Sequence, residues 1–163
     1  MTKVLFICHG NICRSTMAQC VFTDMVKKLH REHEFYIDSA ATSREEIGNP
    51  PHYGTVNKLR QVGIPVVPHR ARQMTREDYA EYDYLLCADT ANIKNTLRIV
   101  GPDQEEKIHL LMDFADEKNW KNGIINNSGR SIADQWYTGN FVTTYDNIVE
   151  GLNGFMKYLR CRS

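Results

Sequence analysis

Strand and helix patterns alternate along this chain, and this alternation restricts the fold more than any other feature. Apolar runs typical of buried strands occur four times, at residues 4–7, 35–40, 82–89 and 107–112. Helical apolar spacing or helix-ending Gly and Pro residues mark four further segments: the stretch from Ser15 to Leu29, and residues 53–62, 90–100 and 142–159. Because strand–helix–strand crossovers are right-handed, this order predicts an α/β fold with a parallel sheet covered by helices on both faces.

Length and charge narrow the class of protein further. The 163 residues suit one domain, predicted to span 1–163, with an irregular polar segment at 113–139. Twenty basic and twenty acidic side chains balance, which argues against nucleic acid as a partner. The N-terminal apolar run is too short for a secretion signal or a membrane span, so we expect a cytoplasmic protein with no membrane partner. The five cysteines are an odd number, and we expect no disulfide framework.

The segment "ICHGNICRSTMAQ" (residues 7–19) follows the first predicted strand, at the edge of a parallel sheet where ligands bind. A metal site would need Cys8, His9 and Cys13 as ligands. Structural zinc usually takes four ligands, and no second ligand cluster follows, so we expect no metal. The glycine patterns of dinucleotide-binding and ATP-binding loops are also absent.

A strand, a tight loop and a helix start together place several backbone N–H groups and a helix dipole around one point. Cys8 and Arg14 stand at the two ends of this loop in a C-x5-R pattern. A helix N-terminus and a nearby cation favour an ionised thiol, so we expect Cys8 to be a thiolate below a phosphate-sized pocket. Arg14 offers a planar fork for two phosphate oxygens, and Ser15 can donate a hydrogen bond to the thiolate and cap the helix. Gly10 and Asn11 tolerate the positive φ angles that such a loop needs.

This constellation suits phosphoryl transfer through a cysteinyl-phosphate. The chain here resembles the low-molecular-weight protein tyrosine phosphatases. The resemblance rests on "VLFICHGNICRSTMAQ" (4–19), "DSAATS" (38–43), "HRARQMTREDY" (69–79), "YDYLLCADTAN" (82–92) and "ADQWYTG" (133–139), in the family's order and rough spacing. It implies a flavodoxin-like sheet of four parallel strands flanked by helices, with no metal and no cofactor.

The resemblance also implies a role for each loop residue. Cys8 would be the nucleophile, and Arg14 would bind the phosphoryl oxygens. The loop groups that bind the phosphate with Arg14 would come from His9, Gly10, Asn11, Ile12, Cys13 and Ser15. Asn11, Ser15, Ser39 and His69 would hold the loop in shape through hydrogen bonds, and Asp89 with Asn92 would form a structural pair near the site.

Asp134 would be the general acid and base of this reaction. A phenolate leaving group needs a proton in the first step and the attacking water needs a base in the second, and one carboxylate can serve both. Trp136 and Tyr137 follow it, as two aromatic residues do in the family, and would form a wall of the substrate pocket. Gln135 replaces the family's usual Pro, which predicts a less rigid acid loop.

Two other departures from the family concern the start of the helix and the wall of the pocket. Thr16 stands where relatives begin the helix with Pro. Glu45 and Glu46 occupy the pocket wall where relatives often carry an aromatic and a polar residue. We expect these carboxylates to repel acidic peptides.

Four functions compete on this scaffold. The first is hydrolysis of phosphotyrosine in a protein or peptide, with inorganic phosphate and other oxyanions as inhibitors. The second is a protein-arginine phosphatase, but those relatives carry Thr where this chain has Ile12. The third is an arsenate reductase, which needs further cysteines, and Cys87 lies in a predicted buried strand. A non-enzymatic phosphotyrosine-binding module would be expected to lose Cys8 or Asp134, and both are present.

Cys13 carries a separate prediction. A thiolate is a site of peroxide attack, and a close second thiol can trap the resulting sulfenic acid as a disulfide. Cys8 and Cys13 belong to one small loop, which predicts a reversible disulfide between them.

Overall fold

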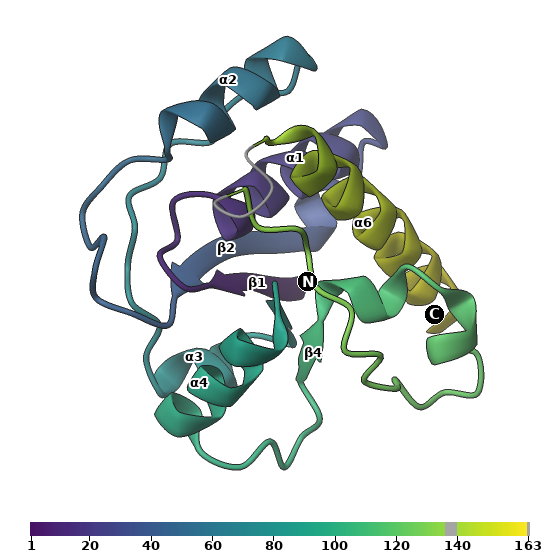
Figure 1. Ribbon diagram of the computed structural model, residues 1–163. Coiled ribbons are helices and arrows are strands. Elements are labelled where there is room, and N and C mark those ends of the chain that lie inside the picture. The colour runs from purple at the N-terminus through teal and green to yellow at the C-terminus, as the bar shows by residue number, and fades with distance from the viewer. Residues whose placement is uncertain (136–139, 163) are drawn as a thin grey trace.

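Four parallel strands form one sheet in the order β2-β1-β3-β4 (Figure 1). The computed structural model describes residues 1–135 and 140–162. The strands are β1 (Thr2–Cys8), β2 (Phe35–Ala41), β3 (Tyr84–Cys87) and β4 (Ile108–Leu110). The helices are α1 (Arg14–Lys28), α2 (Tyr53–Gln61), α3 (Glu77–Glu81), α4 (Thr90–Val100) and α6 (Val142–Arg162), with short 3-10 helices η1 (Glu32–Glu34), η2 (Leu111–Phe114) and η3 (Glu117–Asn119). The predicted α/β fold with a four-stranded parallel sheet is confirmed.

The two faces of the sheet carry separate cores. Successive side chains of a strand point to opposite faces. Along β1, Phe6 and Cys8 face the core that contains α1 and α6, whereas Leu5 and Ile7 face the core beside α3 and α4. Figure 1 shows these helix pairs on opposite sides of the sheet. This alternation directs the Cys8 side chain toward the α1 face.

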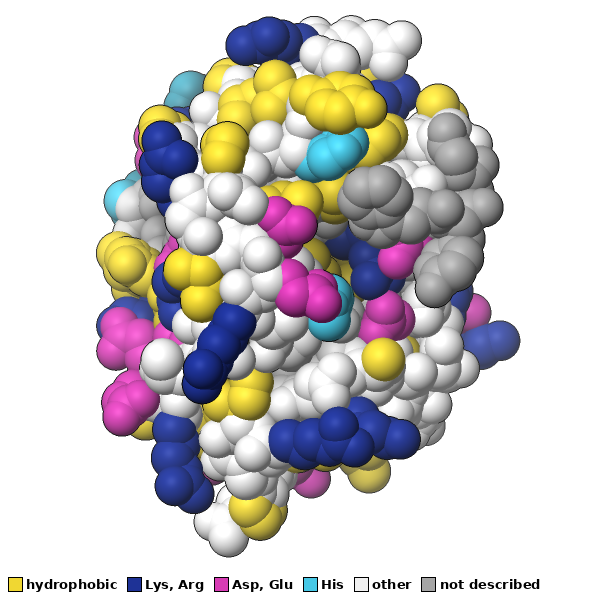
Figure 2. Space-filling view, turned by 60° about the vertical axis from the view of Figure 1, so that its left-hand side comes forward, with side chains coloured by type: hydrophobic (Ala, Val, Ile, Leu, Met, Phe, Trp, Pro, Cys, Tyr) yellow, Lys and Arg dark blue, Asp and Glu magenta, His cyan; other side chains and the backbone are white. Residues whose placement is uncertain are grey.

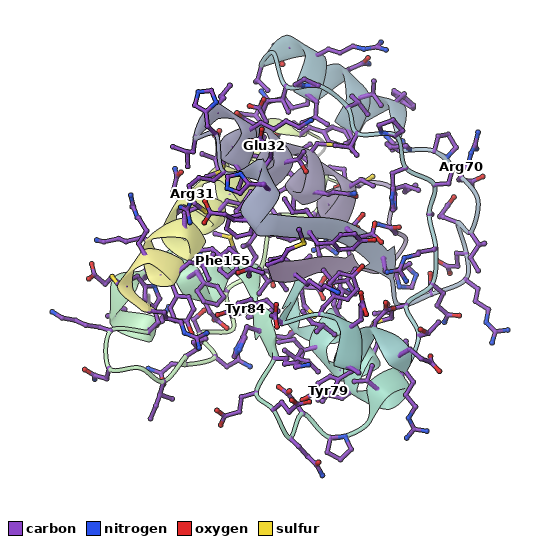
Figure 3. The ribbon with its side chains drawn as sticks, turned by 180° about the vertical axis from the view of Figure 1, so that it is seen from behind. Arg31, Glu32, Arg70, Tyr79, Tyr84 and Phe155 are labelled. Carbon is purple, nitrogen blue, oxygen red and sulfur yellow. The ribbon has the colours of Figure 1, made fainter. Side chains whose placement is uncertain are left out.

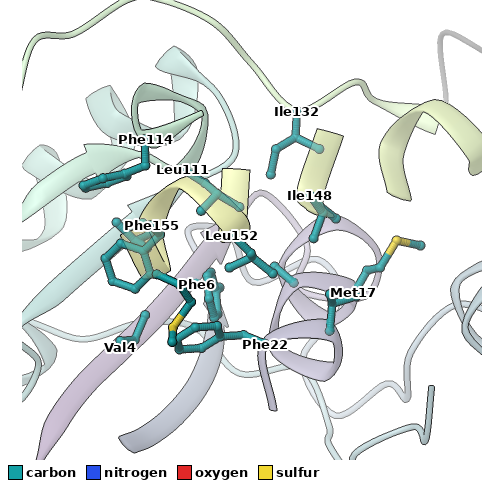
Figure 4. Packing of buried hydrophobic residues seen from close by; sticks show 14 of the residues in the cluster. Val4, Phe6, Met17, Phe22, Leu111, Phe114, Ile132, Ile148, Leu152 and Phe155 are labelled. Atoms are coloured by element: carbon teal, nitrogen blue, oxygen red, sulfur yellow. The ribbon is translucent and has the colours of Figure 1, made fainter. Parts of the chain in front are cut away.

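Phenylalanine rings pack among aliphatic side chains in the core on the α1 face (Figure 4). The Phe22 ring centroid lies 5.9 Å from that of Phe6 and 5.7 Å from that of Phe155. Tyr84 packs edge-on against Phe155 with ring centroids 5.2 Å apart. The view from behind labels both side chains (Figure 3). Each fully buried Phe contributes about 2 kcal/mol of transfer free energy. These contacts tie α1 and α6 to β1 and β3.

The strand order places the loop after β1 at a topological switch point. The chain passes from β1 to β2 on one side and later returns to pair β3 on the other side of β1. In open parallel sheets the crevice beyond the carboxyl ends of such strands is the usual ligand site. Cys8, the last residue of β1, lies at this position.

Three element predictions need correction. The strand predicted at 107–112 ends at Leu110, because the buried Asp113 carboxylate accepts a hydrogen bond from the Leu110 N–H and turns the chain into η2. The strand predicted at 82–89 covers only Tyr84–Cys87, since Asp89 caps α4 instead. The five-residue helix α3 was not predicted.

The apolar residues of the first and last predicted helices are not all buried. Leu29, at the end of the first of these helices, is 54% exposed, and Val142, at the start of the last, is 51% exposed. Both residues stand at helix termini, where the chain leaves the core. Among the helices that the structure describes, none has the length and apolar character needed to cross a bilayer.

Candidate active site

Cys8 lies at the floor of the loop between β1 and α1. Its side chain is buried, and the backbone N–H of Asn11 points at its sulfur at 3.3 Å. The Ser15 hydroxyl oxygen lies 2.9 Å from the same sulfur. The predicted neighbourhood of a serine hydroxyl and loop amides around Cys8 is therefore present.

The start of α1 contributes unpaired donors. The N-cap residue, Cys13, makes no side-chain capping bond. Within residues 1–135 and 140–162, the backbone N–H groups of Gly10, Ile12, Cys13 and Arg14 donate no hydrogen bond. Unpaired N–H groups at a helix N-terminus carry partial positive charge and favour an anion.

The prediction that Ser15 caps this helix was wrong, because Ser15 is already the second helical residue. Its hydroxyl points down to Cys8 rather than back along the helix. The loop backbone also differs in one respect: Asn11 adopts a positive φ of 61°, whereas Gly10 does not. Asparagine tolerates this left-handed conformation better than most residues.

Asn11 joins the loop to the rest of the fold. Its side-chain oxygen accepts a hydrogen bond from the backbone N–H of Arg72 at 3.2 Å and faces His69 Nε2 at 2.7 Å. Since a backbone N–H can only donate, this contact fixes the orientation of the amide. The Asn11 nitrogen then donates to the hydroxyls of Ser15 at 2.8 Å and Ser39 at 2.9 Å. The structure thus brings together Asn11, Ser15, Ser39 and His69, as predicted from the resemblance.

These contacts set the direction of the hydrogen bond to Cys8. The Ser15 oxygen already accepts from Asn11, so the Ser15 hydroxyl proton is available for the Cys8 sulfur. The same reasoning applies to Ser39, which accepts from Asn11 and donates to Gln19 Oε1 at 2.5 Å. The Ser15 hydroxyl can therefore donate a hydrogen bond to the Cys8 sulfur.

Gln19 is a site residue that sequence reasoning missed. It is buried and lies one turn after Ser15 on the same face of α1. The position of this polar residue between the apolar residues Ala18 and Val21 was the available signal, because a polar side chain buried with them is nearly always hydrogen-bonded. Gln19 acts through Ser39 and so positions the loop without touching the reacting atoms.

Replacing Gln19 by Met should lower kcat/KM for p-nitrophenyl phosphate about tenfold, since it leaves the buried Ser39 hydroxyl without its acceptor. Without Gln19, the Ser39 hydroxyl competes for the hydrogen-bond partners of Asn11, which also holds Ser15 beside Cys8. The pH dependence of Cys8 alkylation by iodoacetate should therefore shift to higher pH. The exposed Gln61→Met serves as the matched control. A lower melting temperature with unchanged kcat/KM and an unchanged alkylation profile would show a structural role only.

His69 lies between the loop and a partly buried ion-pair network. Its Nδ1 is 3.6 Å from an oxygen of Asp38, whose other oxygen accepts from the Arg72 guanidinium. Arg72 also donates two hydrogen bonds to Asp78. Burial lowers the pKa of His69, and the neighbouring Asp38 carboxylate opposes this effect. Because Asn11 offers an acceptor oxygen, His69 must carry its proton on Nε2.

Arg14 is held in place on two sides. Its guanidinium donates to Asp89 Oδ2 at 2.9 Å and to the backbone oxygen of Ile132 at 3.2 Å. Asp89 in turn forms a capping box with Asn92 at the start of α4. The predicted structural pair thus orients Arg14, which is 6% exposed. A guanidinium fixed in this way can present its remaining donors to an oxyanion.

Asp134 reaches the same place from a distant segment. Its carboxylate lies 3.6 Å from the Arg14 guanidinium and is partly exposed. Hydrogen bonds fix the two residues before it. The Ile132 N–H donates to the Ala88 carbonyl. The Ala133 N–H donates to the Asn147 side chain of α6, and the Ala133 carbonyl accepts from the Thr144 hydroxyl of the same helix. The structure therefore brings Asp134 to Arg14, at the mouth of the loop.

Acidic side chains form one side of this mouth. Glu45 Oε2 contacts His9 Nε2 at 2.5 Å, and the Glu46 side chain lies over Gly10. Figure 2 shows a hollow with a basic side chain in its depth, acidic side chains along its rim, and hydrophobic and histidine side chains above. Glu45 and Glu46 thus lie beside the loop, where the pocket wall was predicted. Trp136 and Tyr137, the other predicted wall residues, lie outside the described residues.

Comparison of the whole chain with known proteins identifies its family. Residues 3–162 match the family profile described as low molecular weight phosphotyrosine protein phosphatase. The human protein of that description is 37% identical over 160 residues, which cover 95% of this chain and 94% of the human one. The chain belongs to this family. The resemblance inferred from the sequence is thereby confirmed.

Two solved structures extend the comparison with this phosphatase family. The crystal structure of YfkJ from Bacillus subtilis aligns with a TM-score of 0.88 and 32% identity, covering 100% of this chain and 97% of that one. The crystal structure of a Drosophila arginine phosphatase aligns with a TM-score of 0.78 and 25% identity, covering 98% of each chain. The scaffold is thus shared by proteins described as acting on different phosphorylated residues.

The structure shows the surroundings of Thr16 and Gln135, two positions where the chain departs from the pattern expected of the phosphatase family. The Thr16 hydroxyl donates to the Cys13 carbonyl at 3.0 Å, in the first turn of α1, where the family resemblance led us to expect Pro. Gln135 is 6% exposed, and its side-chain oxygen has no hydrogen-bond partner among the described residues. Its effect on the rigidity of the acid loop stays a prediction.

Cys13 and Cys87 are also buried cysteines. Burial raises the pKa of the Cys13 thiol to about 12 and that of the Cys87 thiol to about 12. Both are therefore protonated at neutral pH. All five cysteines are free. No cluster of three or more His, Cys, Asp or Glu side chains within residues 1–135 and 140–162 is arranged to hold a metal ion.

Proposed function

We propose that this chain hydrolyses phosphotyrosine in proteins or peptides through a cysteinyl-phosphate intermediate. The observation that carries the proposal is the convergence of three groups on one loop: the buried Cys8 sulfur, the fixed Arg14 guanidinium and the Asp134 carboxylate. Family membership supports the same reaction.

In the first step the Cys8 thiolate attacks the phosphorus atom and an S–P bond forms. The bond between phosphorus and the tyrosine oxygen breaks, and Asp134 gives its proton to that oxygen. Arg14 and the unpaired loop amides hold the phosphoryl oxygens, whose charge is spread in the transition state. Ser15 stabilises the thiolate before attack and again when it leaves.

In the second step water attacks the phosphorus atom of the cysteinyl-phosphate. The Asp134 carboxylate takes a proton from this water, the S–P bond breaks, and inorganic phosphate is released. The thiolate and the protonated Asp134 are thereby restored. Inorganic phosphate and similar oxyanions occupy the same loop and should inhibit competitively.

Protein-arginine phosphatase activity is the second candidate, since a Drosophila arginine phosphatase shares this fold at 25% identity. Ile12, half-buried in the loop, favours phosphotyrosine as the substrate instead. Its side chain is larger and more apolar than the Thr expected of arginine phosphatases, and it suits a phenyl group better than a guanidinium. Arsenate reduction ranks third. Cys87 is fully buried on the other face of the sheet from Cys8, so the relay that this reaction needs is not formed by these two residues.

The decisive experiment measures phosphotyrosine, phosphoserine and phosphoarginine hydrolysis and arsenate reduction side by side with one preparation. We expect kcat/KM for phosphotyrosine to exceed each of the others by at least about tenfold, because the buried Cys8 favours the long, flat phenyl phosphate. A higher kcat/KM for phosphoarginine would assign the second function instead.

A secondary role is proposed for Cys13. Peroxide would convert the Cys8 thiolate to a sulfenic acid, with hydroxide as the other product. The Cys13 thiol would then displace water from that sulfenic acid to form a Cys8–Cys13 disulfide. Oxidation also removes the negative charge of Cys8, which is one of the causes that raise the Cys13 pKa. The second thiol thus becomes easier to ionise once the first is oxidised.

Peroxide inactivation should be fully reversed by dithiothreitol in the wild type and only partly in Cys13→Ser. Without the second thiol, Cys8 proceeds to sulfinic acid, which thiols do not reduce. The measurement is activity on p-nitrophenyl phosphate after graded peroxide doses, with exposed Cys161→Ser as the control. Equal recovery in the wild type and Cys13→Ser would contradict the protective disulfide.

A further inference from the structure

Three rings lie side by side next to the phosphate-binding loop: the exposed Tyr53 ring and the half-buried His52 and Phe141 rings. Tyr53, the first residue of α2, is 74% exposed, which is unusual for so large a side chain. The His52 ring stacks on it with centroids 4.3 Å apart and also stacks with the Phe141 ring at 5.9 Å. We call Tyr53, His52 and Phe141 the aromatic platform.

The platform is attached directly to the loop. The His52 backbone N–H donates to the Ile12 carbonyl at 2.9 Å, and Ile12 stands between Cys8 and Arg14. The His52 Nδ1 accepts from the Gly54 N–H at 3.0 Å, which holds the imidazole at the start of α2. The platform therefore keeps a set position relative to the floor of the site.

Gly54 is needed for this arrangement. A Cβ atom at this position would lie 2.2 Å from the Phe141 ring, far inside van der Waals contact. The ring thus occupies the space that any other residue would fill. Phe141 also packs against the core on the α1 face, which anchors the platform from below.

The mouth of the site consequently has two unlike sides. Glu45 and Glu46 lie on one, where they contact His9 and Gly10, and the platform approaches the loop through Ile12. In Figure 2 hydrophobic and histidine side chains gather above the hollow and acidic side chains along its rim. A substrate segment that enters the loop with its phosphotyrosine must place its neighbouring residues on these two surfaces.

We propose that the platform binds an apolar or aromatic side chain that flanks the phosphotyrosine, while the acidic side favours a basic residue on the other flank. This rests on the proposed function and adds the class of substrate sequence to it. Aromatic rings attract apolar and aromatic side chains through burial and offset stacking. Because Tyr53 lies outside the loop and is widely exposed, it contacts the flanking residue rather than the phosphorylated ring.

The test compares substrates with and without flanking residues. One set of phosphotyrosine peptides carries Phe at a single position, from three residues before to three residues after the phosphotyrosine, in an alanine background; p-nitrophenyl phosphate has no flank. For at least one position, Phe should raise kcat/KM about tenfold over the alanine peptide, through KM. Tyr53→Ala should abolish that gain and leave hydrolysis of p-nitrophenyl phosphate unchanged.

Two controls separate the platform from general effects. Tyr53→Phe retains the ring and should keep the gain. Tyr36→Ala removes another exposed tyrosine, on β2, and should change nothing. An equal gain in Tyr53→Ala and the wild type would overturn the proposal, as would an equal loss on p-nitrophenyl phosphate and on the peptides. If the wild type hydrolysed neither the peptides nor p-nitrophenyl phosphate, the proposed function itself would fail. That result is distinct from the two outcomes that would overturn the platform proposal alone.

Discussion

Replacing Cys8 by Ser should lower phosphate release from an aryl phosphate by at least about a thousandfold, because the substitution removes the nucleophile itself. A serine hydroxyl stays protonated at neutral pH, and no described side chain in hydrogen-bond contact with the Cys8 sulfur is a general base. Steady-state release of phosphate from p-nitrophenyl phosphate and from a phosphotyrosine peptide measures the effect.

The same variant should still bind oxyanions. The loop amides, the Arg14 guanidinium and their supports are unchanged, so binding of inorganic phosphate by calorimetry should remain measurable. Cys20→Ser changes a buried thiol elsewhere on α1 and serves as the matched control. Substantial turnover by Cys8→Ser would reject Cys8 as the nucleophile, whatever the outcome for binding.

Replacing Asp134 by Ala should slow turnover most for substrates whose leaving group needs a proton. General acid catalysis is worth between about a hundredfold and ten-thousandfold. The loss should therefore be large for phenyl phosphate and smaller for p-nitrophenyl phosphate, whose leaving group departs as a stable anion. A series of aryl phosphates, plotted as log kcat against the pKa of the leaving phenol, makes the comparison.

The exposed Asp146 of α6 provides the control, since Asp146→Ala removes a carboxylate without approaching Arg14. A uniform loss across all leaving groups would reject proton donation by Asp134. It would point instead to a role of this carboxylate in placing Arg14, from which it is separated by only 3.6 Å.

The loop between β1 and α1 could be predicted from the sequence because its parts are consecutive. Cys8, Asn11, Arg14 and Ser15 belong to one strand–loop–helix segment, so their spacing alone restricts their geometry. Ser39, His69 and Asp134 come from segments far along the chain, and no periodicity relates them to Cys8. They were predicted from the family resemblance, and the structure brings them to the loop.

Other features depend on contacts between segments that no sequence pattern reveals. Gln19 was missed because its partner, Ser39, lies on the adjacent strand. The end of β4 was misplaced because Asp113 also accepts hydrogen bonds from Ser128, fifteen residues away, and so bends the chain early. The aromatic platform arises where Phe141 fills the space beside Gly54, which is a property of the folded chain alone.

Asn11 has a consequence beyond the chemistry of the loop. It is fully buried, and its side chain bonds to α1, to β2 and to the 69–72 segment, while its own backbone adopts the left-handed φ that shapes the loop. The loop is therefore held in shape by contacts of the folded chain itself. We expect a change at this junction to lower activity and global stability together, even at residues that never meet the substrate.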